Sequence, residues 1–129
     1  MIAVDTNIVV RLLVRDDEPQ YQKSLLLFQT QDIFIPDTVI LETEWVLRFA
    51  YRFQLGEISQ AFRNLFGLSN VFLANASRIQ QILQWHQQGL DFADAFHLAQ
   101  SQHCLELYSF DEKFCKKAEG LAPCEVKAP

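Results

Sequence analysis

Four carboxylates stand where acidic side chains could act together on one substrate. Asp5 and Asp111 each follow a short apolar run that is typical of a buried strand. If these strands are parallel, their carboxyl ends lie at the same edge of the sheet, which is where open α/β sheets bind ligands. Glu42 and Asp94 each interrupt strongly apolar helical sequence, so we expect both side chains to point inward.

The residues around Glu42 indicate which side of its helix is buried. Val46, Phe49 and Phe53 follow Glu42 at helical spacing, which places the carboxylate on an apolar face. Glu44 lies off that face, and we expect it to be solvated. An inward carboxylate is costly without a partner, so Glu42 is a candidate for a functional site.

Two of the aspartates also have a simpler explanation as helix caps. Asp5 directly precedes a helical pattern, and capping that helix would account for it without any chemistry. Asp91 stands three residues before Asp94 and is most simply the N-cap of the helix that begins there, although it could line the same pocket. At Asp5 the sequence leaves both explanations open.

Several acids that converge on one place need a counter-charge. Two carboxylates about 5 Å apart repel each other by roughly 3 kcal/mol at an effective dielectric constant of about 20. The acidic segments offer no matching set of buried cations, which makes a divalent metal ion the natural partner. Oxygen ligands select a hard ion, Mg²⁺ or Mn²⁺, and such ions commonly hold phosphate substrates. The expected chemistry is activation of a water molecule for attack on a phosphodiester.

Short apolar runs alternate with helical patterns along the chain, which predicts an α/β fold in which helices flank a mainly parallel sheet of four or five strands. Asp37 or Thr38 is expected to cap the longest helix. No linker or repeat interrupts the pattern, so we expect a single domain over residues 1–129. The expected strands are 2–5, 33–35, 71–73 and 105–110, and the expected helices are 7–14, 19–30, 37–53, 57–66, 75–88, 92–102 and 111–119, with a tail at 120–129 that either adds an edge strand or frays.

The amino-acid composition indicates the cellular compartment of the protein and the kinds of partner that it could bind. Half of the 129 residues are hydrophobic, which is enough for one core of ordinary size. No apolar run is long enough to span a bilayer and no secretory signal is visible, so we expect a cytoplasmic protein. Cys104, Cys115 and Cys124 are an odd number with no close pair, which favours a reducing compartment. The net charge of −5 speaks against a broad nucleic-acid-binding face but agrees with acids gathered at a metal site.

The four acids in their sequence contexts resemble the acidic pattern of PIN-domain ribonucleases, in particular the VapC-type toxins of prokaryotic toxin–antitoxin pairs. The likeness covers about residues 1–118 in matching order and spacing. The motifs are Asp5-Thr6-Asn7 after the first strand, Glu42 in Ile40-Leu41-Glu42-Thr43-Glu44-Trp45, Asp94 in Asp91-Phe92-Ala93-Asp94-Ala95, and Asp111 in Ser109-Phe110-Asp111-Glu112-Lys113-Phe114.

The resemblance implies a PIN-like domain with a metal-dependent ribonuclease site. Its four acids would surround one or two Mg²⁺ or Mn²⁺ ions, with Glu42 acting directly or through water. The resemblance also implies cleavage of RNA, pairing with a small antitoxin protein, and a homodimer. The implied ligands are Asp5, Glu42, Asp94 and Asp111, and the implied supporting residues are Thr6, Asn7 and Ser109.

The surfaces that would hold RNA and protein partners are suggested by charge and hydrophobicity. Basic residues gather at helical spacing, although a solvated helix face is the simpler account of each set. A core of this size cannot bury every apolar side chain, so we expect an exposed patch at a dimer or antitoxin interface. The candidates for RNA are Arg11, Arg15, Arg48 and Lys113, and those for a partner are Leu25, Leu26, Leu27, Phe28, Phe62, Leu65 and Phe66.

Other functions are less well supported by the residues. A phosphatase with Asp5 as nucleophile would need a second Asp two residues later, where Asn7 stands. Zinc is disfavoured because His86, His97 and His103 lack a paired spacing and no Cys-x-x-Cys occurs. The alternative from a different functional class is a non-catalytic interaction module. Such a PIN-like domain would bind a partner but cleave no substrate. The presence of all four acids argues against it.

Overall fold

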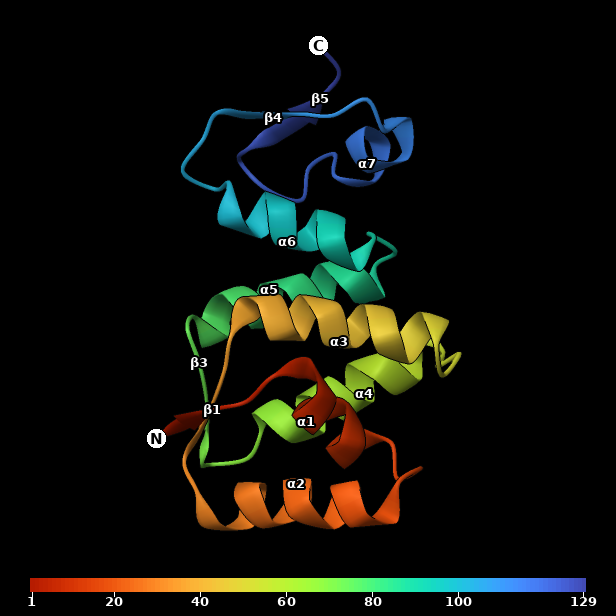
Figure 1. Ribbon diagram of the computed structural model, residues 1–129. Coiled ribbons are helices and arrows are strands. Elements are labelled where there is room, and N and C mark those ends of the chain that lie inside the picture. The colour runs from red at the N-terminus through yellow and green to blue at the C-terminus, as the bar shows by residue number, and fades with distance from the viewer. The chain divides into compact units, whose positions relative to one another are not determined.

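The computed structural model describes all residues from 1 to 129, and the chain divides into two compact units, Met1–Ala76 and Ser77–Pro129. Figure 1 labels the helices of both units and all of their strands except β2. The expectation of a single domain over residues 1–129 stays a prediction.

The first unit is built on a parallel sheet of three short strands in the order β1-β2-β3. The strands are β1 (Ile2–Ala3), β2 (Ile33–Ile35) and β3 (Val71–Leu73). Ile33 lies opposite Ile2 of β1 and Val71 of β3, so β2 is the central strand. Both Ile33 and Ile35 are buried, as an unbroken apolar run in a parallel sheet predicts.

Four helices complete the first unit. They are α1 (Thr6–Leu13), α2 (Glu18–Thr30), α3 (Asp37–Phe49) and α4 (Leu55–Phe66). Local chemistry begins α2, because the Asp17 side chain accepts a hydrogen bond from the backbone N–H of Gln20 at 3.1 Å and Pro19 stands in the first turn. In α4, Ile58, Phe62 and Leu65 recur at helical spacing and are all buried.

The second unit contains three helices and a sheet of two parallel strands. These elements are α5 (Ala76–Gln87), α6 (Phe92–Gln100), β4 (Glu106–Tyr108), α7 (Glu112–Lys117) and β5 (Glu125–Lys127). Gly89 joins α5 to α6 with φ +107°, a backbone conformation that favours glycine. In the sheet, Glu106 lies opposite Glu125 and Tyr108 opposite Lys127.

The α/β class, the parallel strands and the number of strands agree with the sequence. The hydrogen-bonded strands form two sheets, of three and two strands, where one sheet was expected, because β4 pairs with β5 and β3 pairs with β2. The tail forms β5 and therefore adds a strand. None of the helices is long and apolar enough to cross a membrane.

Two expectations about α3 are wrong. Its N-cap is Pro36, whose carbonyl oxygen accepts from the backbone N–H groups of Val39 and Ile40 at 3.0 and 3.1 Å, so neither Asp37 nor Thr38 caps the helix. Asp37 is instead the first helical residue, where a negative charge is favourable. The helix ends at Phe49 rather than at residue 53, and Arg52 shortly afterwards has φ +57°, which is outside the helical region.

The contrast between two leucines tests this description of the core. Leu47 in α3 is 0% exposed, whereas Leu26 in α2 is 59% exposed. We expect Leu47→Ala to lower the free energy of unfolding by about 2–5 kcal/mol, since it removes a buried side chain and leaves a cavity. Leu26→Ala should change it by no more than about 0.5 kcal/mol. Urea unfolding measures both, and equal losses would contradict the assignment of the buried face.

Candidate active site

Asp5 lies just after β1 and caps α1. Its Oδ1 accepts a hydrogen bond from the backbone N–H of Ile8 at 3.2 Å. The capping role that the sequence left open is therefore confirmed. Asp5 is exposed, and its second carboxylate oxygen accepts no hydrogen bond from the protein, so capping leaves half of the carboxylate available to a ligand.

The residue after Asp5 connects the start of α1 to α3. The hydroxyl group of Thr6 donates a hydrogen bond to Oε1 of Glu42. Asp5, Thr6 and Glu42 are termed here the amino-terminal acidic group. The bond restricts the Glu42 side chain, and the supporting role of Thr6 stays a prediction. Asn7 is exposed beside the group.

The orientations expected for Glu42 and Glu44 are reversed. Glu42 is exposed, whereas Glu44 is 1% exposed and accepts two hydrogen bonds from Arg48, at 2.8 and 3.2 Å. The residues of α3 are apolar on more than one side, so spacing alone selected the wrong face. A bidentate bond to an arginine four residues later satisfies the buried carboxylate, which explains why Glu44 can be buried.

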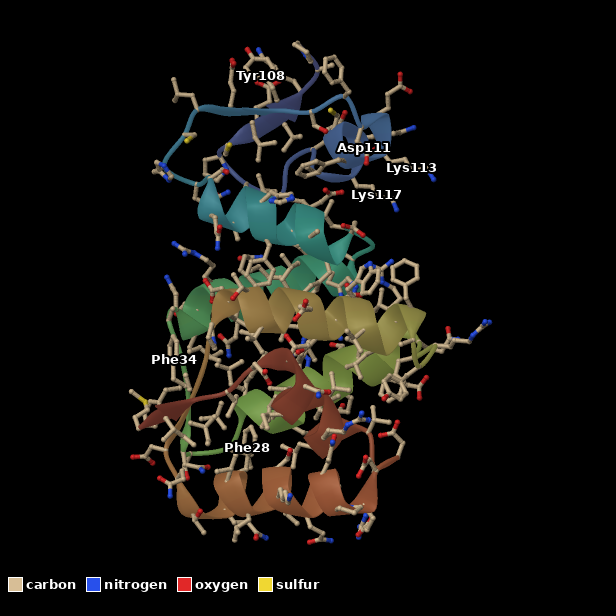
Figure 2. The ribbon with its side chains drawn as sticks, in the orientation of Figure 1. Phe28, Phe34, Tyr108, Asp111, Lys113 and Lys117 are labelled. Atoms are coloured by element: carbon tan, nitrogen blue, oxygen red, sulfur yellow. The ribbon has the colours of Figure 1, made fainter.

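The second unit holds three further acids, termed here the carboxyl-terminal acidic group: Asp91, Asp94 and Asp111. Asp91 is the N-cap of α6, and its Oδ2 accepts from the backbone N–H of Asp94 at 3.2 Å. Asp111 is the N-cap of α7, with Oδ1 accepting from the backbone N–H groups of Lys113 and Phe114 at 2.9 and 3.2 Å. Asp111, Lys113 and Lys117 are labelled around α7 in Figure 2.

Ser109 contacts the residue that caps α7, and its supporting role stays a prediction. The Ser109 hydroxyl oxygen accepts a hydrogen bond from the backbone N–H of Asp111 at 3.0 Å. This bond shapes the turn between β4 and α7 on which the carboxylate of Asp111 stands.

The electrostatics of Asp94 connect the acids of the second unit. Partial burial raises the pKa of the Asp94 carboxyl group, and the negative charges of Asp91 and Asp111 raise it further. His97 acts in the opposite direction, and more weakly. Asp94 and Asp111, which are 17 positions apart in the sequence, therefore lie close enough for their charges to interact.

The donor atoms of this group fit a hard divalent cation. Mg²⁺ is commonly bound by one or two carboxylates and completes its coordination with water and substrate phosphate. Asp94 and Asp111 supply two such carboxylates. Burial is the main cause of the raised pKa of Asp94, and a cation beside Asp94 would offset the further contribution of the charges on Asp91 and Asp111. Neither unit gathers three or more His, Cys, Asp or Glu side chains around one metal position. Water and substrate would have to supply the remaining ligands.

The basic candidates differ in how free they are to bind RNA. Three arginines are already paired with carboxylates, whereas Lys113 is exposed and makes no side-chain hydrogen bond or ion pair. Hydrogen bonds from the side chains of Arg15 and Gln22 lower the pKa of Glu18 to about 2. The pairs are Arg11–Asp16 at 2.9 Å, Arg15–Glu18 at 2.6 Å and Arg48–Glu44 at 2.8 Å.

One residue that positions the site was not expected from the sequence. Nζ of Lys117, at the end of α7, donates to the carbonyl oxygen of Gly89 at 3.0 Å. The bond ties the helix that Asp111 caps to the turn just before Asp91 and α6. No local signal could have indicated it, because the two residues are 28 positions apart.

Comparison with known proteins identifies the family of the chain. Residues 2–120 match the PIN domain. The matched region includes every residue of both acidic groups. No curated protein matches the chain.

The raised pKa of Asp94 predicts a pH-dependent effect of its charge on stability. A raised folded-state pKa means that the ionised form destabilises the metal-free protein at neutral pH, and that this penalty disappears as the pH falls through the raised value. We therefore expect Asp94→Asn to raise the melting temperature in EDTA at pH 7. The gain should shrink as the pH is lowered.

A second measurement compares melting temperatures with and without added metal ions, because a ligand that binds the folded protein stabilises it to an extent that depends on the affinity. The increase in melting temperature on addition of Mn²⁺ should be smaller in Asp94→Asn than in the parent. Asp32→Asn, which changes an exposed carboxylate outside both acidic groups, should alter neither quantity. A metal-free Asp94→Asn protein that melts below the parent would show that the carboxylate stabilises the fold instead.

Proposed function

The chain belongs to the PIN domain family, and from this premise we propose that it is a metal-dependent endoribonuclease, the toxin of a VapC-type toxin–antitoxin pair. The match over residues 2–120 is the observation that carries the nuclease assignment, since PIN domains are typically nucleases. The choice of RNA and the role as a toxin are our proposals, supported by the acidic motifs.

We propose that Asp94 and Asp111 hold Mg²⁺ or Mn²⁺. A bound ion would lower the pKa of a coordinated water molecule and neutralise charge that develops on the phosphodiester. Asp111 keeps Oδ2 available because only Oδ1 caps α7. Asp94 donates its backbone N–H to Asp91, and this bond fixes the position of Asp94 in the first turn of α6.

We further propose that Asp5 and Glu42 serve the same reaction. Support comes from the sequence motifs in which they stand and from the Thr6–Glu42 hydrogen bond, which groups Glu42 with the residue next to Asp5. Asp5 would bind an ion or orient the attacking water through the oxygen that does not cap α1. Thr6, Asn7 and Ser109 would act by holding these carboxylates rather than by contacting the reacting atoms.

Lys113 is our leading candidate for contact with the RNA backbone. It follows Asp111 by two residues, is exposed, and has no acidic partner, unlike Arg11, Arg15 and Arg48. A cation beside a metal-binding carboxylate would attract the phosphates that flank the cleaved bond. The overall negative charge of the chain makes such a local contact more important for affinity.

The proposed partners are an antitoxin and a second copy of the chain, in the cytoplasm. Among the apolar residues expected at an interface, Phe62, Leu65 and Phe28 are buried and so are excluded, while Leu26 is largely exposed. A better candidate is the pair formed by Trp45 and Phe49 on α3, each 56% exposed, whose rings are 5.2 Å apart. Two exposed aromatic rings four residues apart could receive the apolar face of an antitoxin helix.

Cleavage of RNA tests the proposed activity directly. The purified protein, free of any antitoxin, should cut a mixture of structured RNAs in Mg²⁺ or Mn²⁺ and stop when EDTA is added. Asp111→Asn and Asp5→Asn should each reduce the rate by about 10²–10³-fold, as loss of one charged group at a reaction centre does. Both should keep the parent's melting temperature in EDTA to within a few degrees, because Asn caps a helix as well as Asp.

Asp32→Asn is the matched control and should cut at the parent's rate. A parent protein that binds Mn²⁺ and RNA but leaves the RNA intact would favour the non-catalytic module. An Asp111→Asn protein as active as the parent would exclude this residue from the site while leaving the nuclease assignment in place.

The role of Lys113 is tested by the salt dependence of RNA binding. We expect Lys113→Ala to weaken binding of a labelled single-stranded RNA in EDTA, and to lower the slope of log Kd against log salt by about 0.7, the value for one phosphate contact. Arg15→Ala, which removes a cation already paired with Glu18, is the control and should leave the slope unchanged. Fluorescence anisotropy at several salt concentrations measures both slopes. Equal slopes for parent and Lys113→Ala would rule out the contact.

A further inference from the structure

The last turn of α1 is joined to the segment just after α3 by a closed set of side-chain hydrogen bonds. Nη1 of Arg11 donates to Oδ1 of Asp16 at 2.9 Å and to the hydroxyl oxygen of Tyr51 at 3.3 Å. The Tyr51 hydroxyl group donates in turn to Oδ2 of Asp16 at 2.8 Å. Each side chain contacts the other two, and the three residues are termed here the Tyr51 clamp.

The clamp is anchored on two helices besides α1. Nε of Arg11 donates to Oε1 of Gln20 in α2 at 2.6 Å. The backbone N–H of Tyr51 donates to the carbonyl oxygen of Val46 at 3.4 Å, so Tyr51 is fixed to the last turn of α3. The bond to Asp16 raises the pKa of the Tyr51 hydroxyl group, which therefore stays protonated and able to donate at neutral pH.

The helix that the clamp holds, α1, also carries the residue that contacts Glu42. Thr6 lies in the first turn of α1 and Arg11 in its last turn. The Thr6 hydroxyl group donates to Oε1 of Glu42 in α3. The start of α1 is therefore attached to α3 by this bond, and the end of α1 is attached to α3 by the clamp. A helix that is attached to its neighbour at one point can still slide or turn about that point, and a second attachment restricts both motions.

We propose that Tyr51 is a positioning residue for Glu42, because the clamp fixes where α1 lies on α3 and so the direction in which Thr6 holds the carboxylate. Glu42 is exposed, so contacts with the core do not fix its side chain. Tyr51 acts through α1 rather than by contact with RNA or metal. A reacting group must be held within about 0.5 Å of its productive position, so a displaced α1 would lower the rate. The effect on the rate rests on the proposed nuclease function, whereas the effect on the placement of α1 does not.

Cleavage kinetics of the full chain test the proposal. Tyr51→Phe removes one hydroxyl group but keeps the ring and the ion pair between Arg11 and Asp16. We expect kcat to fall by about tenfold and KM to change by less than about twofold, because Lys113, the residue proposed to bind RNA, is untouched. Tyr21→Phe also removes a hydroxyl group from a half-buried tyrosine, but one outside the clamp. It is the matched control and should change neither constant.

A second substitution shows whether the effect passes through Glu42. In a Glu42→Gln background, Tyr51→Phe should cause no further loss of rate, since the charge that the clamp positions is already absent. A merely structural role for the clamp predicts that Tyr51→Phe lowers the rate by the same factor in both backgrounds.

Unfolding in urea supplies a measurement that needs no activity. Thr6→Val and Tyr51→Phe each remove one hydroxyl group, and the two residues share no hydrogen-bond partner. Changes at such sites normally multiply in the equilibrium constant for unfolding. If both hydroxyl groups hold α1 on α3, losing one attachment weakens the other. The change in the double variant should therefore fall short of the product of the single changes by about threefold or more.

The outcomes separate this proposal from the nuclease assignment. A double variant whose unfolding constant changes by the product of the single changes would overturn the proposal, whether or not the parent cuts RNA. For an active parent, a Tyr51→Phe protein with unchanged kcat, or with the same loss in the Glu42→Gln background, would also overturn it. A shortfall in the unfolding constant of a protein that leaves RNA intact would support the positioning of Glu42 and contradict the nuclease assignment alone.

Discussion

Three aspartates stand where the chain enters a helix, and each uses one carboxylate oxygen to cap that helix. Asp5 does so for α1, Asp91 for α6 and Asp111 for α7. The backbone N–H groups at a helix start are donors without intrahelical partners, so the caps stabilise the helices and at the same time hold the carboxylates in one orientation. Each of the two acidic groups depends on this double use of a side chain.

Asp94 is the acid for which crowding is most evident. Its carboxyl group is partly desolvated near Asp91 and Asp111, and each of these influences favours the protonated form. The bond between Lys117 and Gly89 contributes to this arrangement, because it joins the helix capped by Asp111 to the turn before α6. The fold therefore maintains an electrostatic cost at Asp94, and the part that comes from the two neighbouring aspartates is the part that a bound cation would reduce.

The two glutamates of α3 lie in different environments although they are only two residues apart. Glu44 is buried and accepts two hydrogen bonds from Arg48, so its charge is compensated within the helix. Glu42, two residues earlier, is exposed and is held by the hydroxyl group of Thr6, a neutral donor that leaves its charge uncompensated. An uncompensated carboxylate beside Asp5 suits a role in chemistry, and a compensated one suits a role in packing.

The sequence by itself determined the features that arise from neighbouring residues. The bounds of β2 and β3, the cap at Asp91, the helix that ends before Gly89 and the PIN-like acidic motifs all follow from local patterns of apolar, capping and turn residues. Only the tertiary structure decided which face of α3 is buried, that Lys117 reaches Gly89, and that β4 pairs with β5. Each of these depends on the packing of segments far apart in the chain, and α3 has apolar residues on more than one side, so the spacing of residues within a segment could not select among the alternatives.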